Sequence, residues 1–123
     1  PEGALLDGTS LGEALTVLDA HLTPRPLGYM FNCVHPVHVR RVLIFTFNYS
    51  RALAARILGL QGNASKKSPK QLDGSRTLDS QDPDAFARDM LALQTEFGLK
   101  ILGGCCGTNQ HHIRSIARLW GRA

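Results

Sequence analysis

The sequence predicts an α/β fold in which parallel strands alternate with helices. Three short apolar runs, at residues 27–31, 56–60 and 99–102, are each followed by a segment that reads as a helix, and one further helix precedes them. Such an alternation implies parallel strands with helices packed outside the sheet. The length of 123 residues, with 43% hydrophobic and 20% charged residues, is typical of one globular domain.

The first helix and the first strand occupy the N-terminal part of the chain. Ser10 and Glu13 form a capping-box pattern ahead of apolar residues at helical spacing, so a helix is expected to begin here and to end at a pair of prolines. The apolar run at 27–31 follows as a buried strand that continues into Asn32 and stops at Cys33.

The middle of the chain contains one helix with an ambiguous pattern, followed by the second strand. A helix is expected to open at His35-Pro36, although residues 42–47 are β-branched or aromatic and would suit a strand by propensity alone. Residues 56–60 form the second strand, which ends in the turn-prone sequence at 62–65. The polar segment 66–81 is expected to run over the surface.

The strongest helix signals lie in the C-terminal part of the chain. Asp82-Pro83 supplies an N-cap and a proline at the first helical position of a helix that runs to Phe97. The last strand then reaches the sequence Gly-Gly-Cys-Cys-Gly at 103–107. Thr108 or Asn109 can cap the final helix, whose apolar residues share one side.

The three cysteines all lie just beyond the C-terminal ends of predicted strands. Cys33 follows the first strand, and Cys105 and Cys106 follow the third. Because parallel α/β folds build their active sites at this end of the sheet, the three thiols can converge. Their odd number suits a reducing compartment, with the cytoplasm as the expected location, and a metal or catalytic role rather than a disulfide framework.

The adjacent cysteines favour metal binding over a disulfide with each other. Neighbouring Cα atoms are about 3.8 Å apart, whereas disulfides need roughly 4.4 to 6.8 Å. Consecutive strand residues point to opposite faces, so both thiols reach one ion only if the backbone bends, and Gly103, Gly104 and Gly107 permit that bend. Histidines 35 and 38, near the first cysteine, are expected to be surface or helix residues rather than ligands.

The chemistry of three thiolates points to zinc and to thiol alkylation. Thiolates are soft donors that suit Zn²⁺, and three protein ligands with an open fourth position indicate a catalytic site. With a fourth sulfur bound as thiolate, the site carries a charge of about −2 and is a weak Lewis acid. It still deprotonates a bound thiol but leaves the sulfur electron-rich, so attack on a methyl group fits this site better than hydrolysis.

Two motifs resemble those of a known family. The sequence at 103–109, followed by His112-Ile113, resembles the closing signature of the homocysteine S-methyltransferase domain. Asn32-Cys33, followed by Pro36, resembles the upstream zinc-ligand motif of that family, and the segment 62–65 falls where the family has an Asn-Ala turn. The resemblance covers nearly all of the chain.

The resemblance implies a partial (β/α)₈ TIM barrel. Residues 1–123 would be the C-terminal part of a homocysteine S-methyltransferase domain and would supply its last three strand–helix units, strands six to eight, preceded by a helix. A complete barrel takes roughly 250 residues. The five N-terminal strands, with the acidic and glycine-rich signature of the first strand and a glutamate of the fifth, are therefore absent from this sequence.

The resemblance also implies the reaction and the residues that serve it. Cys33, Cys105 and Cys106 would hold a catalytic Zn²⁺, the homocysteine thiol would be its fourth ligand, and a small-molecule methyl donor would convert homocysteine to methionine. Four further residues would line or shape the substrate pocket: Asn32, Asn63, Gly103 and Gly104. The methyl donor and the oligomeric state are not indicated. The alternative is a non-catalytic zinc-binding module that keeps the metal motif without the substrate pocket.

Charge and hydropathy exclude two other classes of partner. Fourteen Lys and Arg against ten Asp and Glu give a net charge of +4, but the basic residues are scattered and Lys66, Lys67 and Lys70 form their only close group. Without a basic stripe interleaved with aromatic residues, we expect no nucleic-acid binding. Apolar runs all fall short of the roughly 18 residues that a membrane span needs, so we expect no membrane partner.

Overall fold

Eight helices and strands make up the part of the chain that the structure describes. The computed structural model describes residues 10–65 and 81–121 of the chain. Its elements, in chain order, are α1 (Leu11–His21), β1 (Tyr29–Val34), α2 (Pro36–Tyr49), α3 (Arg51–Ala54), β2 (Ile57–Gly62), α5 (Pro83–Phe97), β3 (Ile101–Gly104) and α6 (Gln110–Trp120). Most of the polar segment expected at 66–81 lies outside the described residues.

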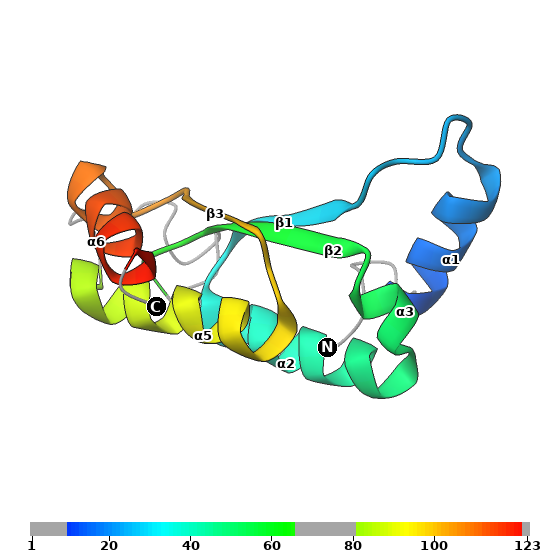
Figure 1. Ribbon diagram of the computed structural model, residues 1–123, viewed down its shortest axis with the longest axis horizontal. Helices are drawn as coiled ribbons and strands as arrows, with labels where there is room; N and C mark the ends of the chain where they lie inside the picture. The colour runs from blue at the N-terminus through cyan, green and yellow to red at the C-terminus, as the bar shows by residue number, and fades with distance from the viewer. Residues whose placement is uncertain (1–9, 66–80, 122–123) are drawn as a thin grey trace, which may run out of the picture.

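The strands form an open parallel sheet in sequential order. β2 lies in the middle and pairs in parallel with β1 on one side and β3 on the other. The crossovers through α2 and α5 place both helices along one face of the sheet, and no described helix covers the opposite face (Figure 1). The predicted α/β class, with parallel strands that alternate with helices, is confirmed.

The predicted caps account for where the helices begin. The Ser10 hydroxyl accepts a hydrogen bond from the backbone N–H of Glu13, and the Asp82 carboxylate accepts from the first turn of α5. Of the two candidate caps for α6, Asn109 is the one used. These side chains satisfy backbone N–H groups that have no partner within the helix.

Tertiary packing decides the ambiguous segment 42–47, which is helical as expected. It lies within α2, whose buried residues Val39, Leu43 and Thr46 recur at helical spacing against the core. Burial of that face outweighs the β propensity of the individual residues. The short helix α3 was not predicted; the Ser50 hydroxyl caps it by accepting from Leu53 N–H at 3.2 Å.

All three strands differ in their bounds from the sequence prediction, and β2 spans 57–62 instead of 56–60. β1 does not stop at Cys33 but continues to Val34, and β3 spans 101–104 instead of 99–102. The reason is pairing with β2, because the ladder extends to Gly62, which pairs with both Val34 and Gly104. Apolar character marked the runs in the sequence, but the neighbouring strand sets where they end.

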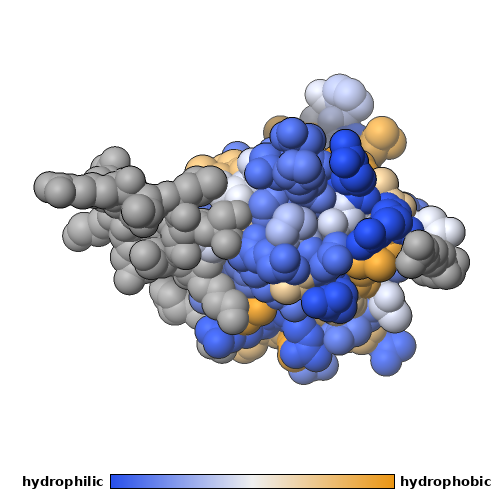
Figure 2. All heavy atoms as spheres, turned by 90° about the vertical axis from the view of Figure 1, so that its left-hand side faces the viewer, coloured by the Kyte–Doolittle hydropathy of each residue, from blue (hydrophilic) through white to orange (hydrophobic). Residues whose placement is uncertain are grey.

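The hydrophobic core lies between the helices and one face of the sheet. Its members are Leu15, Val39, Leu43, Ile57, Leu60, Ala64, Phe86, Ala87, Met90, Leu93, Leu99 and Ile116. On the other face, Met30 of β1 and Ile101 of β3 are 45% and 47% exposed. At the α6 end the surface is mainly hydrophilic (Figure 2). The sheet is thus packed on its helix side and open on the other.

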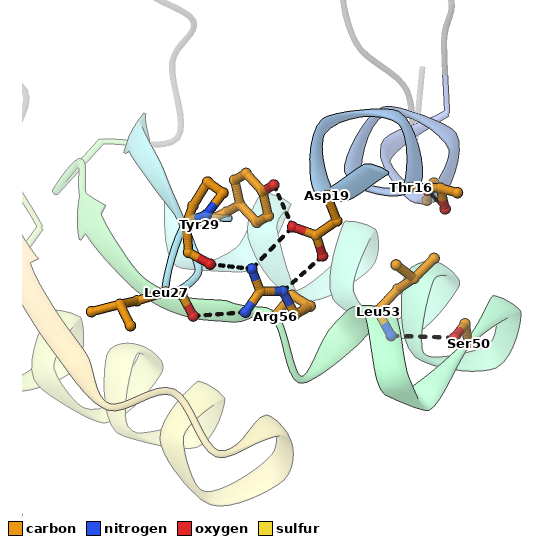
Figure 3. A network of polar contacts seen from close by, with 9 residues as sticks. Thr16, Asp19, Leu27, Tyr29, Ser50, Leu53 and Arg56 are labelled. Carbon is orange, nitrogen blue, oxygen red and sulfur yellow. Dashed lines mark hydrogen bonds and ion pairs between the residues drawn. The ribbon is translucent and has the colours of Figure 1, made fainter. Parts of the chain in front are cut away.

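An ion-pair network fastens α1 to the start of β2. Arg56 donates from Nε to Asp19 Oδ2 at 2.8 Å and from Nη2 to Asp19 Oδ1 at 3.0 Å, and Tyr29 Oη donates to the same carboxylate at 2.7 Å (Figure 3). Arg56 also donates to the backbone carbonyls of Pro26 and Leu27. The network lies at the N-terminal end of the strands, the end opposite the cysteines.

We expect Asp19→Asn to destabilise the protein in a pH-dependent way. The hydrogen bond from Arg56, followed by that from Tyr29, lowers the pKa of Asp19 from 3.8 to about 2. A lowered pKa stabilises the fold above about pH 4, and that contribution disappears as the pH falls through about 2. Urea unfolding at several pH values should therefore show a lower midpoint for the variant at pH 7 and a shrinking difference toward pH 2.

Glu96→Gln is the matched control for this experiment. Its exposed pair with Arg40 has side chains 40% and 49% exposed, and such pairs contribute little. An Asp19→Asn difference that stayed constant from pH 7 to pH 2 would contradict the role given to the carboxylate.

Candidate metal centre

The three cysteines converge at the C-terminal edge of the sheet. Cys33 lies in β1, and Cys105 and Cys106 follow β3 directly. Their Sγ atoms all lie within 4.8 Å of one another, although β2 separates the two strands that carry them. Convergence of the thiols, which their positions after strands predicted, is confirmed.

A disulfide joins two of these cysteines in the structure. It links Cys33 and Cys105, whose Cα atoms are 5.4 Å apart, while Cys106 is a free and exposed thiol. The adjacent pair is not joined, as the sequence indicated, but the expectation of a metal or catalytic role rather than a disulfide does not hold for Cys33 and Cys105 in this state. Because a disulfide sulfur is not a thiolate donor, only the reduced protein offers three ligands.

The same spacing also suits metal ligation after reduction. In a tetrahedral site with Zn–S bonds of about 2.3 Å, two sulfur atoms lie roughly 3.8 Å apart. The limit of 4.8 Å on the sulfur separations in the cluster is close to that value. The cluster is therefore compact enough for its three sulfur atoms to share one ion once the disulfide is reduced.

Cys33 reaches the cluster through a bulge in β1. Asn32 pairs with Gln61 and Val34 pairs with the next residue of β2, so Cys33 is an extra residue in the ladder. Its φ of 60° lies in the left-handed region, which non-glycine residues rarely adopt. Bulges re-aim side chains at the ends of strands, and strained backbone often marks a functional position. No feature of the sequence pattern indicated this conformation.

The end of β2 holds both cysteine-bearing segments in place. The Asn63 side-chain Nδ2 donates to the Cys33 carbonyl at 2.9 Å, and Cys105 N–H donates to the Gly62 carbonyl at 2.8 Å. Ala64 N–H donates to the carbonyl of Cys106 at 2.9 Å. Residues 62–64 are therefore a common anchor for the two segments.

The three glycines around the cysteine pair have different roles, although the sequence suggested one. Only Gly107 of the three has a positive φ, 78°. A Cβ on Gly104 would lie 2.3 Å from Thr108 Oγ1, which donates to the Cys105 carbonyl at 2.7 Å. A Cβ on Gly103 would meet only Gln61 Cγ, at 3.9 Å. Gly104 thus lets the Cys105 turn close, and Gly103 leaves open space.

The two asparagines expected in the substrate pocket occupy different surroundings. Asn32 is exposed in β1, beside a cavity of about 280 Å³ that also borders α1 and that none of the three cysteines lines. Asn63 is 2% exposed, and its Oδ1 is the one buried side-chain atom among the described residues that lacks a hydrogen-bond partner. Since buried polar atoms are nearly always paired, this oxygen is available to a ligand.

Two buried histidines cap the helices that follow the cysteine-bearing segments. His35 is 1% exposed and caps α2, and His112 is 2% exposed and belongs to the capping box of α6. Of the two positions expected for His35, surface or helix, the structure shows the helix, since the buried side chain caps α2. The sequence did contain a signal for this cap. His35 directly precedes Pro36, and proline is favoured at the first position of a helix.

Comparisons with known proteins give one family across the whole chain. The family model described as "Homocysteine S-methyltransferase" matches residues 1–120. Methionine synthases of Mycobacterium leprae (strain TN) and Mycobacterium tuberculosis (strain ATCC 25618 / H37Rv) are each 49% identical to this chain over 35 residues, which is 28% of this chain and 3% of the relative. No solved structure matches. None of the described helices is both long and apolar enough to cross a membrane.

We expect Cys33→Gly to be more stable than Cys33→Ala. Both variants lose the sulfur, but only alanine strains the left-handed backbone, by about 1 kcal/mol. Chemical denaturation of the reduced proteins measures the difference. At Cys105, where φ is not positive, the same pair of substitutions should give the opposite order. Greater stability of alanine at both positions would contradict the strain at Cys33.

The two neighbouring glycines should respond differently to alanine. Gly104→Ala should destabilise the protein by about 1 to 3 kcal/mol, because the new methyl group overlaps Thr108. Gly103→Ala should change the free energy of unfolding by less than about 0.5 kcal/mol, as at an open site. If urea unfolding gave both variants the same decrease in the free energy of unfolding, Gly104 would not be the more crowded of the two positions.

Proposed function

Because this chain belongs to the homocysteine S-methyltransferase family, we propose that it supplies the zinc-binding part of an enzyme that methylates the homocysteine thiol to form methionine. The observation that carries the proposal is the convergence of Cys33, Cys105 and Cys106 at the C-terminal edge of a parallel sheet. A reducing compartment such as the cytoplasm would keep these thiols available.

The architecture supports the further proposal that these are the last three units of a (β/α)₈ barrel. Sequential parallel strands with the α2 and α5 crossovers on one face are what a barrel wall requires. The opposite face is open, and the apolar cavity beside the free edge of β1 leaves room for a neighbouring strand to pack against α1. The five remaining strands would close the barrel around that face.

The donor set fits a zinc ion once the protein is reduced. Three soft sulfur donors within 4.8 Å suit tetrahedral zinc and leave one ligand position for substrate. Cys33, Cys105 and Cys106 would hold the ion. Bound there, zinc would lower the pKa of a coordinating thiol and leave its sulfur nucleophilic enough to attack a methyl group.

The remaining residues would bind and orient the amino acid. The unpaired Oδ1 of Asn63 is a buried acceptor suited to the ammonium group of homocysteine, since its Nδ2 is already used on the Cys33 carbonyl. Asn32 lies on the open face, and the open space at Gly103 leaves room for the substrate. These contacts would hold the thiol near the three cysteines and the methyl donor on the open side.

The proposed reaction is a substitution at the methyl carbon. The homocysteine sulfur forms a new C–S bond as the bond between the methyl carbon and the donor breaks. The bonding electrons leave with the demethylated donor, and the thiol proton is released to solvent. The chain's contribution is therefore to orient the thiol and to hold the ion that favours its deprotonated form.

A non-catalytic zinc-binding module is the second candidate. The observation that favours it is the open sheet face, which leaves the cluster without a closed substrate pocket among the described residues. Both candidates require zinc at the three cysteines, so they differ only in methyl transfer.

We expect near-stoichiometric zinc in the reduced protein and its loss in Cys105→Ser. Elemental analysis of the parent, of Cys105→Ser and of Glu96→Gln as a remote control measures this. Protein kept oxidised should bind none, because the disulfide removes two donors. Zinc-loaded protein in which this chain is joined to the remaining strands of the proposed barrel is then incubated with homocysteine and a panel of labelled methyl donors. Labelled methionine supports the enzyme, zinc without methionine supports the module, and failure of the reduced parent to bind zinc overturns both.

A further inference from the structure

We propose that Gln81 is a positioning residue for the metal centre, because it joins the two buried histidines that cap the helices following the cysteine-bearing segments. The inference rests on the proposed zinc site. Cys33 is followed by α2, and Cys105 and Cys106 are followed by α6. A link between the starts of these two helices would set the distance between the two groups of sulfur atoms.

The first histidine connects α2 to Gln81. The Nδ1 atom of His35 accepts a hydrogen bond from Val37 N–H at 3.1 Å and so caps the helix. Because Nδ1 is the acceptor, the proton of the neutral ring is on Nε2, which lies 2.9 Å from the side-chain oxygen of Gln81. His35 therefore donates to Gln81, and it does so only two residues from Cys33.

The second histidine connects α6 to the same residue. The Nδ1 atom of His112 accepts from Asn109 N–H at 3.1 Å, which again assigns the proton to Nε2. That Nε2 donates to the backbone carbonyl of Gln81 at 2.8 Å. The ring is fixed further by an edge-to-face contact with Phe86, with ring centroids 5.5 Å apart.

Gln81 is itself held by two other elements. Its backbone N–H donates to the carbonyl of Ala64, just beyond β2, at 2.6 Å, and its Nε2 donates to Asp89 of α5 at 3.0 Å. One residue thus has hydrogen bonds to α2, to the end of β2, to α5 and to α6. Its side chain and backbone cannot shift toward one helix without losing a bond to another.

Helix capping alone does not explain the histidines. Asparagine, aspartate or serine cap helices at least as well, but their side chains end at the capping atom. Histidine caps with one nitrogen and has a second, across the ring, that reaches another residue. The bond to Gln81 is therefore the feature that a simple cap would lack. Groups bonded directly to metal ligands typically change metal affinity about 10- to 100-fold, and Gln81, which would act through the starts of two helices, is expected at the low end of that range.

His35→Asn separates the two roles of the histidine. Asparagine retains an acceptor for Val37 N–H but is too short to reach Gln81. We expect zinc affinity, measured by chelator competition on the reduced protein, to fall about 10-fold. The absorption spectrum of the Co²⁺-loaded protein should also change, because it reports the geometry of the sulfur ligands.

Gln81→Ala and a polarity swap complete the test. Gln81→Ala removes the hydrogen bond between His35 and Gln81 from the Gln81 side. The two substitutions act on one bond, so their effects should not add, and the double variant should bind zinc as well as the weaker-binding single variant. The double variant Gln81→Glu with Asp89→Asn keeps both hydrogen bonds but reverses the second one. The carboxylate at position 81 accepts from His35, and the amide at position 89 donates to that carboxylate. That swap should recover the affinity and the Co²⁺ spectrum of the parent.

Asp19→Asn is the matched control, since it weakens the fold at the opposite end of the strands and should leave zinc affinity unchanged. If His35→Asn and Gln81→Ala bind zinc like the parent, with the parent's Co²⁺ spectrum, the positioning role is overturned while the zinc site stands. The role is also overturned if Asp19→Asn weakens binding equally. If the reduced parent binds no zinc, the proposed function fails as well.

Discussion

The parallel pairing of β1 and β3 to the two sides of β2 is the constraint on which the cysteine cluster depends. Without β2 between them, Cys33 and the Cys105-Cys106 pair would have no fixed relation, because a long stretch of chain separates them. Pairing to one central strand brings both C-terminal ends to the same edge. The backbone of residues 62–64 then bonds to both cysteine-bearing segments.

Convergence also requires local conformations that the chain otherwise avoids. Cys33 occupies a left-handed bulge, and the turn at Cys105 closes only because Gly104 has no side chain next to Thr108. Such strained or crowded positions persist where the surrounding packing and hydrogen bonding determine them. Here the caps of α2 and α6, together with Gln81, supply that support close to the cysteines.

The N-terminal and C-terminal ends of the strands carry different kinds of groups. At the N-terminal end, Arg56 and Asp19 form a compact network that fastens α1 and has no contact with the cysteines. At the C-terminal end lie three sulfur atoms, the unpaired amide oxygen of Asn63 and an open space at Gly103. The cysteine cluster and the ion-pair network therefore lie at opposite ends of the same three strands.

The sequence by itself determined the alternation of strands and helices, the caps at Ser10 and Asp82, and the placement of all three cysteines at or just beyond the C-terminal ends of strands. These features depend on residues within a few positions of one another, so local patterns carry them. Tertiary structure alone decided the ends of β1 and β3, the bulge at Cys33, the Asp19–Arg56 network and the hydrogen bonds from both histidines to Gln81. Each of these depends on partners far apart in the chain, and their meeting is fixed only when the helices pack against the sheet.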